Sequence, residues 1–357
     1  MSNNLNDIVR VNVNIQAPAI DSASFDHLLI IGPAPLVTPD RPLPDVGVYS
    51  DLSELVAAGY VAVGDNADPV GIAARIAFSQ NPRPARIFVA PIQGSITETL
   101  DIAVEQSGWY VICPAGIAES EFESIAEWTE AHTKQFAYTF LSDTDPVSDI
   151  FFRSHGWCGL VHDDDTPATT EIANHYVHVA AVAKCLAFPS GSETWNLQTV
   201  AAIFPSHLSS TLRLQFEDNN SNFTSRNAGR NVTRNGVTRG GEWIDVIRGR
   251  DWLENDMQLR LFNLLLMNPK IPFTDPGIAL VQNEMIASLK SATERGIVAV
   301  DEYDEDGILI PGFVTSVPLS ASITATQKAS RILSDCTFHA RLAGAIHAVR
   351  VDGTLTY

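Results

Sequence analysis

The stretch that decides the fold runs from Gly240 to Ala299 and reads GGEWIDVIRGRDWLENDMQLRLFNLLLMNPKIPFTDPGIALVQNEMIASLKSATERGIVA. Its beginning, Glu242 to Ile247, is rich in large apolar residues and predicts a short strand, which Gly249 should end. Asp251, with Glu254 three positions later, has the pattern of a capping box. We therefore expect a long helix to begin at Asp251.

Two helices are predicted in this stretch. The first should end at Asn268 and Pro269, and the second should begin with Asp275 as its N-cap and Pro276 at its first position. Apolar residues recur at helical spacing in both, and we expect them to be buried. They are Leu253, Met257, Leu261, Phe262 and Leu265 in the first helix, and Ile278, Val281, Met285, Leu289 and Ala292 in the second. The polar residues are interpreted as caps and solvent-facing positions.

The part of the chain before this stretch alternates between short apolar runs and helical patterns. Strands are predicted at 28–31, 86–90, 109–113, 136–141 and 158–162, and helices at 51–58, 69–79, 97–106, 120–133, 170–187 and 205–217. Such alternation predicts an α/β fold with a mostly parallel sheet flanked by helices on both faces.

The N-terminal segment has a different pattern. Between Ile8 and Gln16, the apolar residues Val9, Val11, Val13 and Ile15 alternate with polar ones, which predicts a half-buried strand. Burying four such side chains gains roughly 6–12 kcal/mol, whereas ordering nine residues costs roughly 9–18 kcal/mol. We therefore expect the segment to order only on a sheet edge. The sequence by itself favours an edge of the same chain over that of a neighbouring copy.

Composition restricts the class of protein. The chain has 357 residues, of which 45% are hydrophobic and 18% charged, which predicts a globular protein of two or three domains. A formal charge of −19 disfavours nucleic acid as a partner. The polar first residues do not resemble a signal peptide, and no uncharged apolar run is long enough to cross a bilayer. The four cysteines stand apart, which favours a reducing compartment and argues against a zinc site.

An α/β sheet invites an enzyme interpretation, yet the chemical motifs are missing. The first predicted strand ends in Gly32-Pro-Ala-Pro, whose prolines lack the amides that would hold a phosphate. Neither a P-loop nor a Gly-x-Ser-x-Gly elbow occurs, and Pro189-Ser-Gly-Ser192 is interpreted as a loop. Composition alone leaves a hydrolase triad open. The sequence therefore predicts no catalytic residue and no cofactor.

Three charged or histidine-containing patterns have a structural interpretation. His162-Asp-Asp-Asp165 lacks the ligand spacing of a calcium loop and predicts a solvated loop. His175 and His178 are expected on a polar helix face, without a metal. The most concentrated basic run favours a surface for acidic neighbours over a nucleic-acid groove. It comprises Arg226, Arg230, Arg234, Arg239, Arg248 and Arg250.

Several segments resemble the tail sheath proteins of contractile-tailed phages. They are Gly241-Glu-Trp-Ile-Asp245, Arg248-Gly-Arg-Asp-Trp-Leu253 and Asn268-Pro-Lys-Ile-Pro-Phe-Thr-Asp-Pro-Gly277, and, near the end, Ser322-Ile-Thr-Ala-Thr-Gln-Lys-Ala-Ser-Arg331, Ala340-Arg-Leu-Ala-Gly-Ala-Ile-His347 and Val351-Asp-Gly-Thr-Leu-Thr-Tyr357. The resemblance is specific over about the last third of the chain.

The resemblance implies four segments and an assembly. They are an N-terminal exchange arm (1–20), an α/β core of subtilisin-like architecture without a catalytic triad (21–200), a C-terminal α+β sheath domain (201–344) and a C-terminal exchange strand (345–357). It implies partners too: further copies in stacked six-fold rings, a tail tube protein, the baseplate and the tail terminator, within a virion tail assembled in the host cytoplasm.

The resemblance also implies roles for individual residues. The apolar N-terminal face would pair between copies with the C-terminal residues Ile346, Val349, Val351 and Leu355, and Lys328 and Arg331 would face the tube. A helix of residues 325–333 packed within its own domain is the alternative for the last two. An α/β enzyme and another tail or baseplate component remain alternative interpretations of the whole chain.

Overall fold

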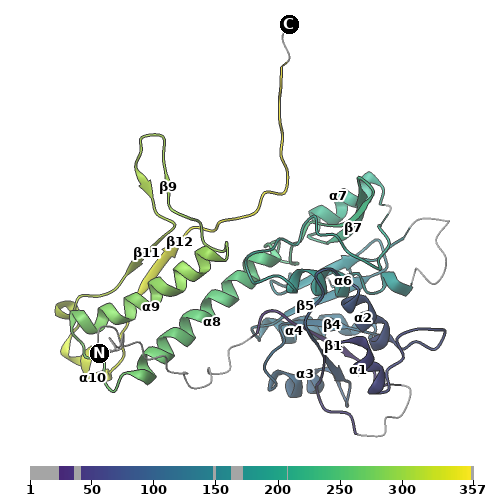
Figure 1. The fold of residues 1–357 in the computed structure, drawn as a ribbon, viewed down its shortest axis with the longest axis horizontal. Coiled ribbons are helices and arrows are strands. Elements are labelled where there is room, and N and C mark those ends of the chain that lie inside the picture. The colour runs from purple at the N-terminus through teal and green to yellow at the C-terminus, as the bar shows by residue number, and fades with distance from the viewer. Residues whose placement is uncertain (1–23, 36–41, 148–149, 162–171, 207, 355–357) are drawn as a thin grey trace, which may run out of the picture.

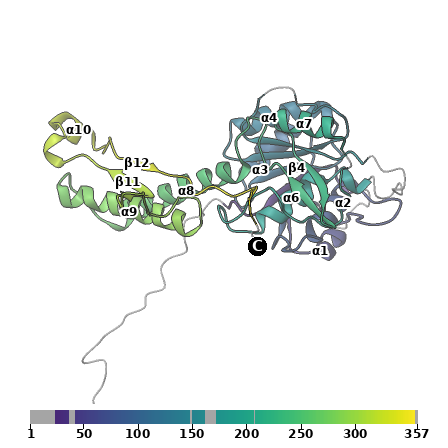
Figure 2. The same cartoon turned by 90° about the horizontal axis from the view of Figure 1, so that it is seen from above.

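The computed structural model describes residues 24–35, 42–147, 150–161, 172–206 and 208–354. These residues form a rounded α/β body and an elongated arm that projects from one side of it (Figures 1 and 2). The N-terminal residues Val9, Val11, Val13 and Ile15, the His162–Asp165 motif and Leu355 lie outside the described residues.

The body is built on a six-stranded sheet with the order β2-β3-β1-β4-β5-β6. All neighbouring pairs are parallel except β2 and β3. The strands are β1 (Leu28–Gly32), β2 (Gly47–Tyr49), β3 (Ile87–Pro91), β4 (Val111–Pro114), β5 (Gln135–Phe140) and β6 (Ser154–Cys158). The predicted mostly parallel sheet is confirmed, although the strand expected at 158–162 lies four residues earlier as β6.

Helices cover both faces of this sheet, so its strands are apolar on both sides. Leu28 and Ile30 of β1 face one core, which includes side chains of α2 and α6, whereas Leu29 and Ile31 face the other, with α3 and α4. The helices of the body are α1 (Leu52–Ala57), α2 (Pro69–Phe78), α3 (Ile96–Val104), the 3-10 turn η2 (Glu119–Glu121), α4 (Phe122–Glu130), α6 (Val177–Leu186) and α7 (Ser210–Asp218).

The segment after α6 still belongs to the body. Phe216 of α7 and Phe223 of β7 are buried in the same core as Phe140 of β5. β7 (Phe223–Asn227) and β8 (Arg230–Arg234) form an antiparallel hairpin.

The arm consists of two long helices and small antiparallel pairs of strands (Figure 1). Its elements are α8 (Ile244–Met267), α9 (Asp275–Glu294), β9 (Glu302–Tyr303), β10 (Leu309–Ile310), β11 (Phe313–Ser316), η3 (Ser320–Ser322), α10 (Ala325–Ser330) and β12 (Thr337–Ala340). Leu289 and Ala292 of α9 are buried together with Ile297 and Val298, so the two helices share a small core at the end nearest the body.

The start of α8 corrects the sequence prediction. The predicted strand from Glu242 to Ile247 is wrong, because α8 begins at Ile244 and Asp251 lies two turns inside it. Asp251 does not cap the helix, since its buried carboxylate binds Arg153 and the Tyr110 hydroxyl. α9 has Thr274 as its N-cap, one residue before the predicted Asp275.

Candidate assembly surfaces

The root of the arm is fixed to the body by a buried arginine. Arg248, in the second turn of α8, has a fully buried side chain that contacts Glu193 at 2.5 Å and Asp26 at 2.8 Å. Its guanidinium also donates to the backbone carbonyls of Phe25, Cys185 and Phe188. A buried charge is tolerated when it is paired and hydrogen-bonded in this way.

A second polar cluster lies one turn further along α8. The fully buried carboxylate of Asp251 accepts hydrogen bonds from Arg153 at 2.6 Å, Arg250 at 3.0 Å and the Tyr110 hydroxyl at 2.7 Å. Burial, with Asp251 beside it, raises the pKa of Tyr110 well above its usual value, so this hydroxyl stays a donor. Together with Arg248, this cluster orients α8 on the body.

The far half of α8 is not covered. Leu253, Met257 and Leu261 are half-buried, whereas Leu265 is 63% exposed and Phe262 53% exposed. The expectation that the whole stripe is buried is therefore wrong for the last two turns. On α9, by contrast, Met285 and Leu289 are buried as predicted.

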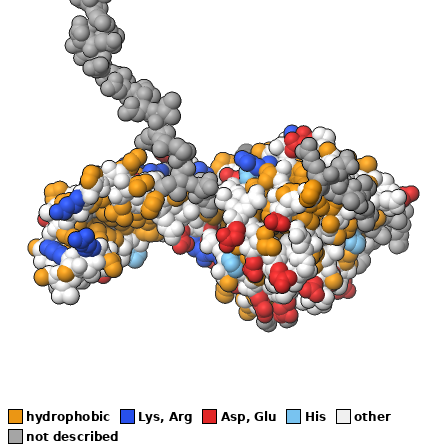
Figure 3. Space-filling view, turned by 90° about the horizontal axis from the view of Figure 1, so that it is seen from below, with side chains coloured by type: hydrophobic (Ala, Val, Ile, Leu, Met, Phe, Trp, Pro, Cys, Tyr) orange, Lys and Arg blue, Asp and Glu red, His pale blue; other side chains and the backbone are white. Residues whose placement is uncertain are grey.

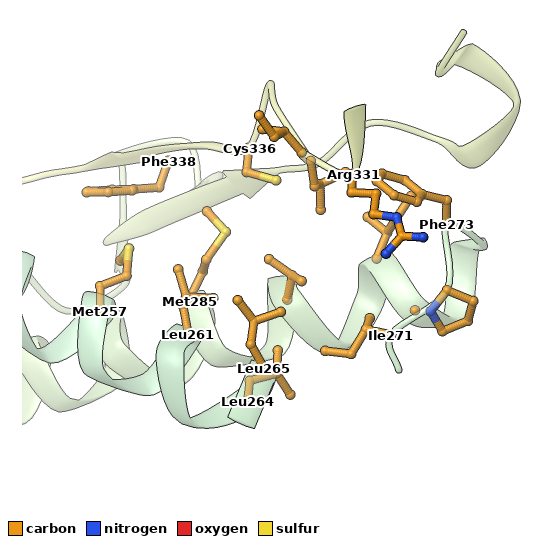
Figure 4. A pocket seen from close by; sticks show the side chains of 16 residues that line it. Met257, Leu261, Leu264, Leu265, Ile271, Phe273, Met285, Arg331, Cys336 and Phe338 are labelled. Atoms are coloured by element: carbon orange, nitrogen blue, oxygen red, sulfur yellow. The ribbon is translucent and has the colours of Figure 1, made fainter. Parts of the chain in front are cut away.

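Leu265, but not Phe262, lines a groove of about 500 Å³ between the two helices and the segment around the start of β12 (Figure 4). Leu261, Leu264 and Leu265 form one wall, Ile278, Val281 and Met285 another, and Ile332, Leu333, Cys336 and Phe338 the third. Figure 3 shows apolar side chains gathered along the arm, with Lys and Arg side chains towards its outer end. The sequence signalled the two stripes but not their exposure.

Over α9 lies the two-stranded sheet of β11 and β12, paired from Phe313–Ala340 to Ser316–Thr337. Among the described residues it has no third strand. Within the described part of the chain, each strand thus presents one edge whose backbone amides and carbonyls are unpaired, and such an edge can accept an added strand.

The chain leaves β12 along a defined path. Arg341 donates to Glu302 at 2.8 Å and to the carbonyls of Val300 and Pro311, and its own backbone pairs with Ala299 and Gly312. These contacts fix the first residue of the C-terminal segment against the base of the arm.

After a backbone hydrogen bond from Ala343 to the Ile297 carbonyl, His347 anchors the segment again. Its Nε2 atom lies 2.8 Å from the Thr194 hydroxyl, and its ring packs edge-on against Trp243 with centroids 4.5 Å apart. Beyond it the chain runs outward in extended form (Figure 1). The predicted exchange residues Ile346, Val349 and Val351 are 83%, 77% and 85% exposed.

The predicted tube-facing residues lie at the outer end of the arm, on and just after α10. Thr324 and Gln327 form a capping box that starts this short helix. Lys328 is half-buried, and its ammonium donates to the carbonyl of Ser320 at 2.8 Å. Arg331 is exposed, has a left-handed backbone with φ of 59°, and borders the apolar groove.

The basic run of the sequence does not form one surface. Arg248 belongs to the core, Arg250 pairs with Asp251, and Arg239 lies 3.5 Å from Asp145. Arg226 and Arg230 are the exposed members on the β7–β8 hairpin. Spacing along the chain could not separate these environments.

The histidine pair is also divided. His178 is fully buried, between the Thr139 hydroxyl at 2.8 Å and the Pro114 carbonyl at 3.1 Å, and burial lowers its pKa to about 3. The predicted polar face is therefore wrong for His178, whereas His175 is exposed. In the described part of the chain, no three His, Cys, Asp or Glu side chains lie together as a metal site, and none of its helices is long and apolar enough to cross a membrane.

Comparison with known proteins supports the resemblance seen in the sequence. Residues 244–355 match a family model described as E217 tail sheath protein gp31-like, C-terminal domain. No curated protein matches the chain in sequence. The tail sheath resemblance is thus confirmed for the C-terminal part.

Solved structures share the fold of the whole chain. A chain of the anti-feeding prophage helical sheath in its contracted state matches with a TM-score of 0.69 at 12% sequence identity. The match covers 97% of this chain and 98% of the sheath chain. One in the contracted PVC sheath complex, an extracellular contractile injection system, has a TM-score of 0.67 at 10% identity, covering 97% and 96%. The sheath tail protein Lin1278 from Listeria innocua has a TM-score of 0.53 at 8% identity, covering 84% and 89%. The α/β body and the arm together have the fold of sheath proteins.

Proposed function

We propose that this chain is the sheath subunit of a contractile tail or a related injection particle. Copies would polymerise as stacked six-fold rings around a tail tube, between a baseplate and a terminator, after assembly in the host cytoplasm. The α/β body would be the subtilisin-like core without a catalytic triad. Contraction would be a change in packing between rigid subunits, which requires no nucleotide.

The observation that carries the proposal is an extended C-terminal segment on the same chain as an open two-stranded sheet. Val349 and Val351 lie beyond the last anchor at His347 and contact nothing on their own body that would bury them. Burying four Val, Ile or Leu side chains of such a segment on a neighbour gains roughly 6–12 kcal/mol. The unpaired edges of β11 and β12 would supply backbone hydrogen bonds. The N-terminal face of Val9, Val11, Val13 and Ile15 would pair in the same intersubunit sheet as Ile346, Val349, Val351 and Leu355.

Truncation tests strand exchange. Proteins lacking residues 348–357 or 1–16 should fold, with the circular dichroism and unfolding transition of the intact chain, because the body and arm keep all their described contacts. Neither should form tubes or rings by electron microscopy under conditions where the intact chain does. Normal tubes from either truncated protein would refute strand exchange, while an intact chain that never polymerises would refute the sheath function.

Tube contact is tested separately at the outer end of the arm. Arg331→Glu, alone and with Lys328→Glu, should weaken binding to the purified tube protein by at least about tenfold. The reason is that negative side chains would then face a tube surface that had paired with positive ones. Because the Lys328 ammonium binds the Ser320 carbonyl, Lys328→Gln serves as the control for local structure. Unchanged tube binding by the double reversal would show that this end packs only against its own chain.

A further inference from the structure

The β9–β10 hairpin is a formed element that its own chain leaves uncovered. All ten residues from 301 to 310 are exposed. The turn is nevertheless held by its own hydrogen bonds: Asp304 accepts hydrogen bonds from the amides of Asp306 at 3.0 Å and Ile308 at 2.7 Å, and Gly307 takes a φ of +76°. Figure 1 shows this hairpin standing away from α8 and α9.

The surface of the hairpin is suited to a partner. Tyr303 is 72% exposed and Ile308 63% exposed, although a two-stranded hairpin alone is only marginally stable in water. At the tip, Glu305 and Asp306 add two carboxylates that make no ion pair among the described residues, whereas Glu302 is already paired with Arg341. The hairpin therefore offers apolar side chains beside a negative tip.

A complementary hollow lies on the body of the same chain. It has a volume of about 430 Å³ beside the β7–β8 hairpin and is lined by Val200, Phe204 and Pro205 together with Arg226 and Arg230. Both arginines are exposed, and neither has a carboxylate partner among the described residues. The lining is mixed, and its apolar residues and two guanidinium groups correspond to the apolar side chains and the two carboxylates of the hairpin.

We propose that the β9–β10 hairpin of one copy docks in the hollow beside β7–β8 of a neighbouring copy. The hairpin lies in the arm, whereas β7, which borders the hollow, lies in the body at a separate place in Figure 1. A contact between two copies would therefore bring the hairpin and the hollow together. Copies with a formal charge of −19 repel one another, and a local pairing of opposite charge fixes which faces meet. This inference rests on the proposed self-assembly and adds a second contact to strand exchange.

Charge exchange tests the docking. One variant carries Glu305→Lys and Asp306→Lys, which spares the turn-forming Asp304, and a second carries Arg226→Glu and Arg230→Glu. Each should raise the protein concentration needed for assembly by at least about tenfold, measured by sedimentation and electron microscopy. The variant with all four changes, and an equal mixture of the two double variants, should assemble again near the concentration needed by the unchanged protein.

A matched control separates local from total charge. Glu119→Lys with Glu121→Lys, at an exposed turn of the body, changes the net charge by the same amount and in the same direction as Glu305→Lys with Asp306→Lys, and it should leave assembly near normal. If the unchanged protein assembles and both double variants do so equally well, the docking is wrong and the sheath proposal stands. Loss of assembly without recovery in the four-change variant or the mixture would show that the hairpin meets another surface, such as the tube. If the unchanged protein never assembles, the sheath proposal and this docking fail together.

Discussion

The two ends of α8 lie in opposite environments. At its start, Ile244, Ile247 and Arg248 are buried in the body, while in its last turn Leu265, Leu266 and Met267 are each more than 60% exposed. Both ends carry large apolar residues, and both are helical in the structure. Helical spacing of apolar residues thus predicts the helix, but it does not tell which chain covers it.

The same contrast separates the whole body from the arm. The body closes two cores around its sheet, whereas the arm has a small core at its base and an apolar groove further out. The proposed assembly would explain this difference, because a neighbouring copy would then cover the apolar side chains that the arm leaves exposed. Substitutions made in the body or in the arm separately test whether the body buries its own apolar residues while the arm depends on a neighbouring copy.

The largest effect is expected where the arm joins the body. Arg248→Ala removes the partner of the buried Glu193 carboxylate and leaves that charge and several carbonyls unsatisfied. We expect a loss of about 3–5 kcal/mol in the free energy of unfolding, measured by urea denaturation.

Two further variants sharpen this prediction. Arg250→Ala, at a half-exposed guanidinium bound to Asp251, should cost less than about 1 kcal/mol. Arg248→Met combined with Glu193→Leu should recover much of the loss, because no buried charge then lacks a partner. Equal stability of Arg248→Ala and the unchanged protein would mean that the arm is not fixed through this cluster.

The body was largely predictable from sequence because its signals are local. Strands such as Leu28–Gly32 are continuous apolar runs, and the side chains of Asp51 and Ser95 accept hydrogen bonds from amides in the first turns of α1 and α3. The root of α8 was not predictable. Asp251 has the pattern of an N-cap, but its partners Arg153 and Tyr110 are about a hundred or more positions away in sequence, so tertiary contacts override the local signal.

The candidate site was predictable only in part. Ile346, Val349 and Val351 are highly exposed, and the last two lie beyond His347, the last anchored residue. Their role between subunits stays a prediction. The groove and the exposure of the apolar side chains on the β9–β10 hairpin could not be predicted, because Leu265 and Tyr303 have the same residue types that fill cores elsewhere. Whether such residues are covered depends on chain geometry that periodicity does not encode.

A pair of identical substitutions gives the next effect in size. Leu289→Ala in the buried base of the arm should cost about 2–5 kcal/mol in the free energy of unfolding of the isolated subunit. Leu265→Ala, at the exposed end of α8, should cost less than about 0.5 kcal/mol in the same measurement. Although Leu265→Ala should barely change the stability of the isolated subunit, it should raise the protein concentration needed for assembly. A large loss of monomer stability from Leu265→Ala would show that the arm covers itself.

The smallest effect concerns a single carboxyl in the first turn of α8. Burial, together with the nearby Glu193 and Glu242, raises the pKa of Asp245 from 3.8 to about 6, and its Oδ1 atom has no hydrogen-bond partner among the described residues. Because the folded pKa lies above the unfolded one, the stability contributed by this group is present below about pH 4 and is lost as the pH rises through 6. Asp245→Asn removes the titration and should stabilise the protein by about 1–3 kcal/mol at pH 7.5, with little effect at pH 4. Thermal unfolding of both proteins across this range measures the difference. A constant difference at all pH values would mean that Asp245 titrates normally, and that the root of α8 is more open to water than the buried body around it.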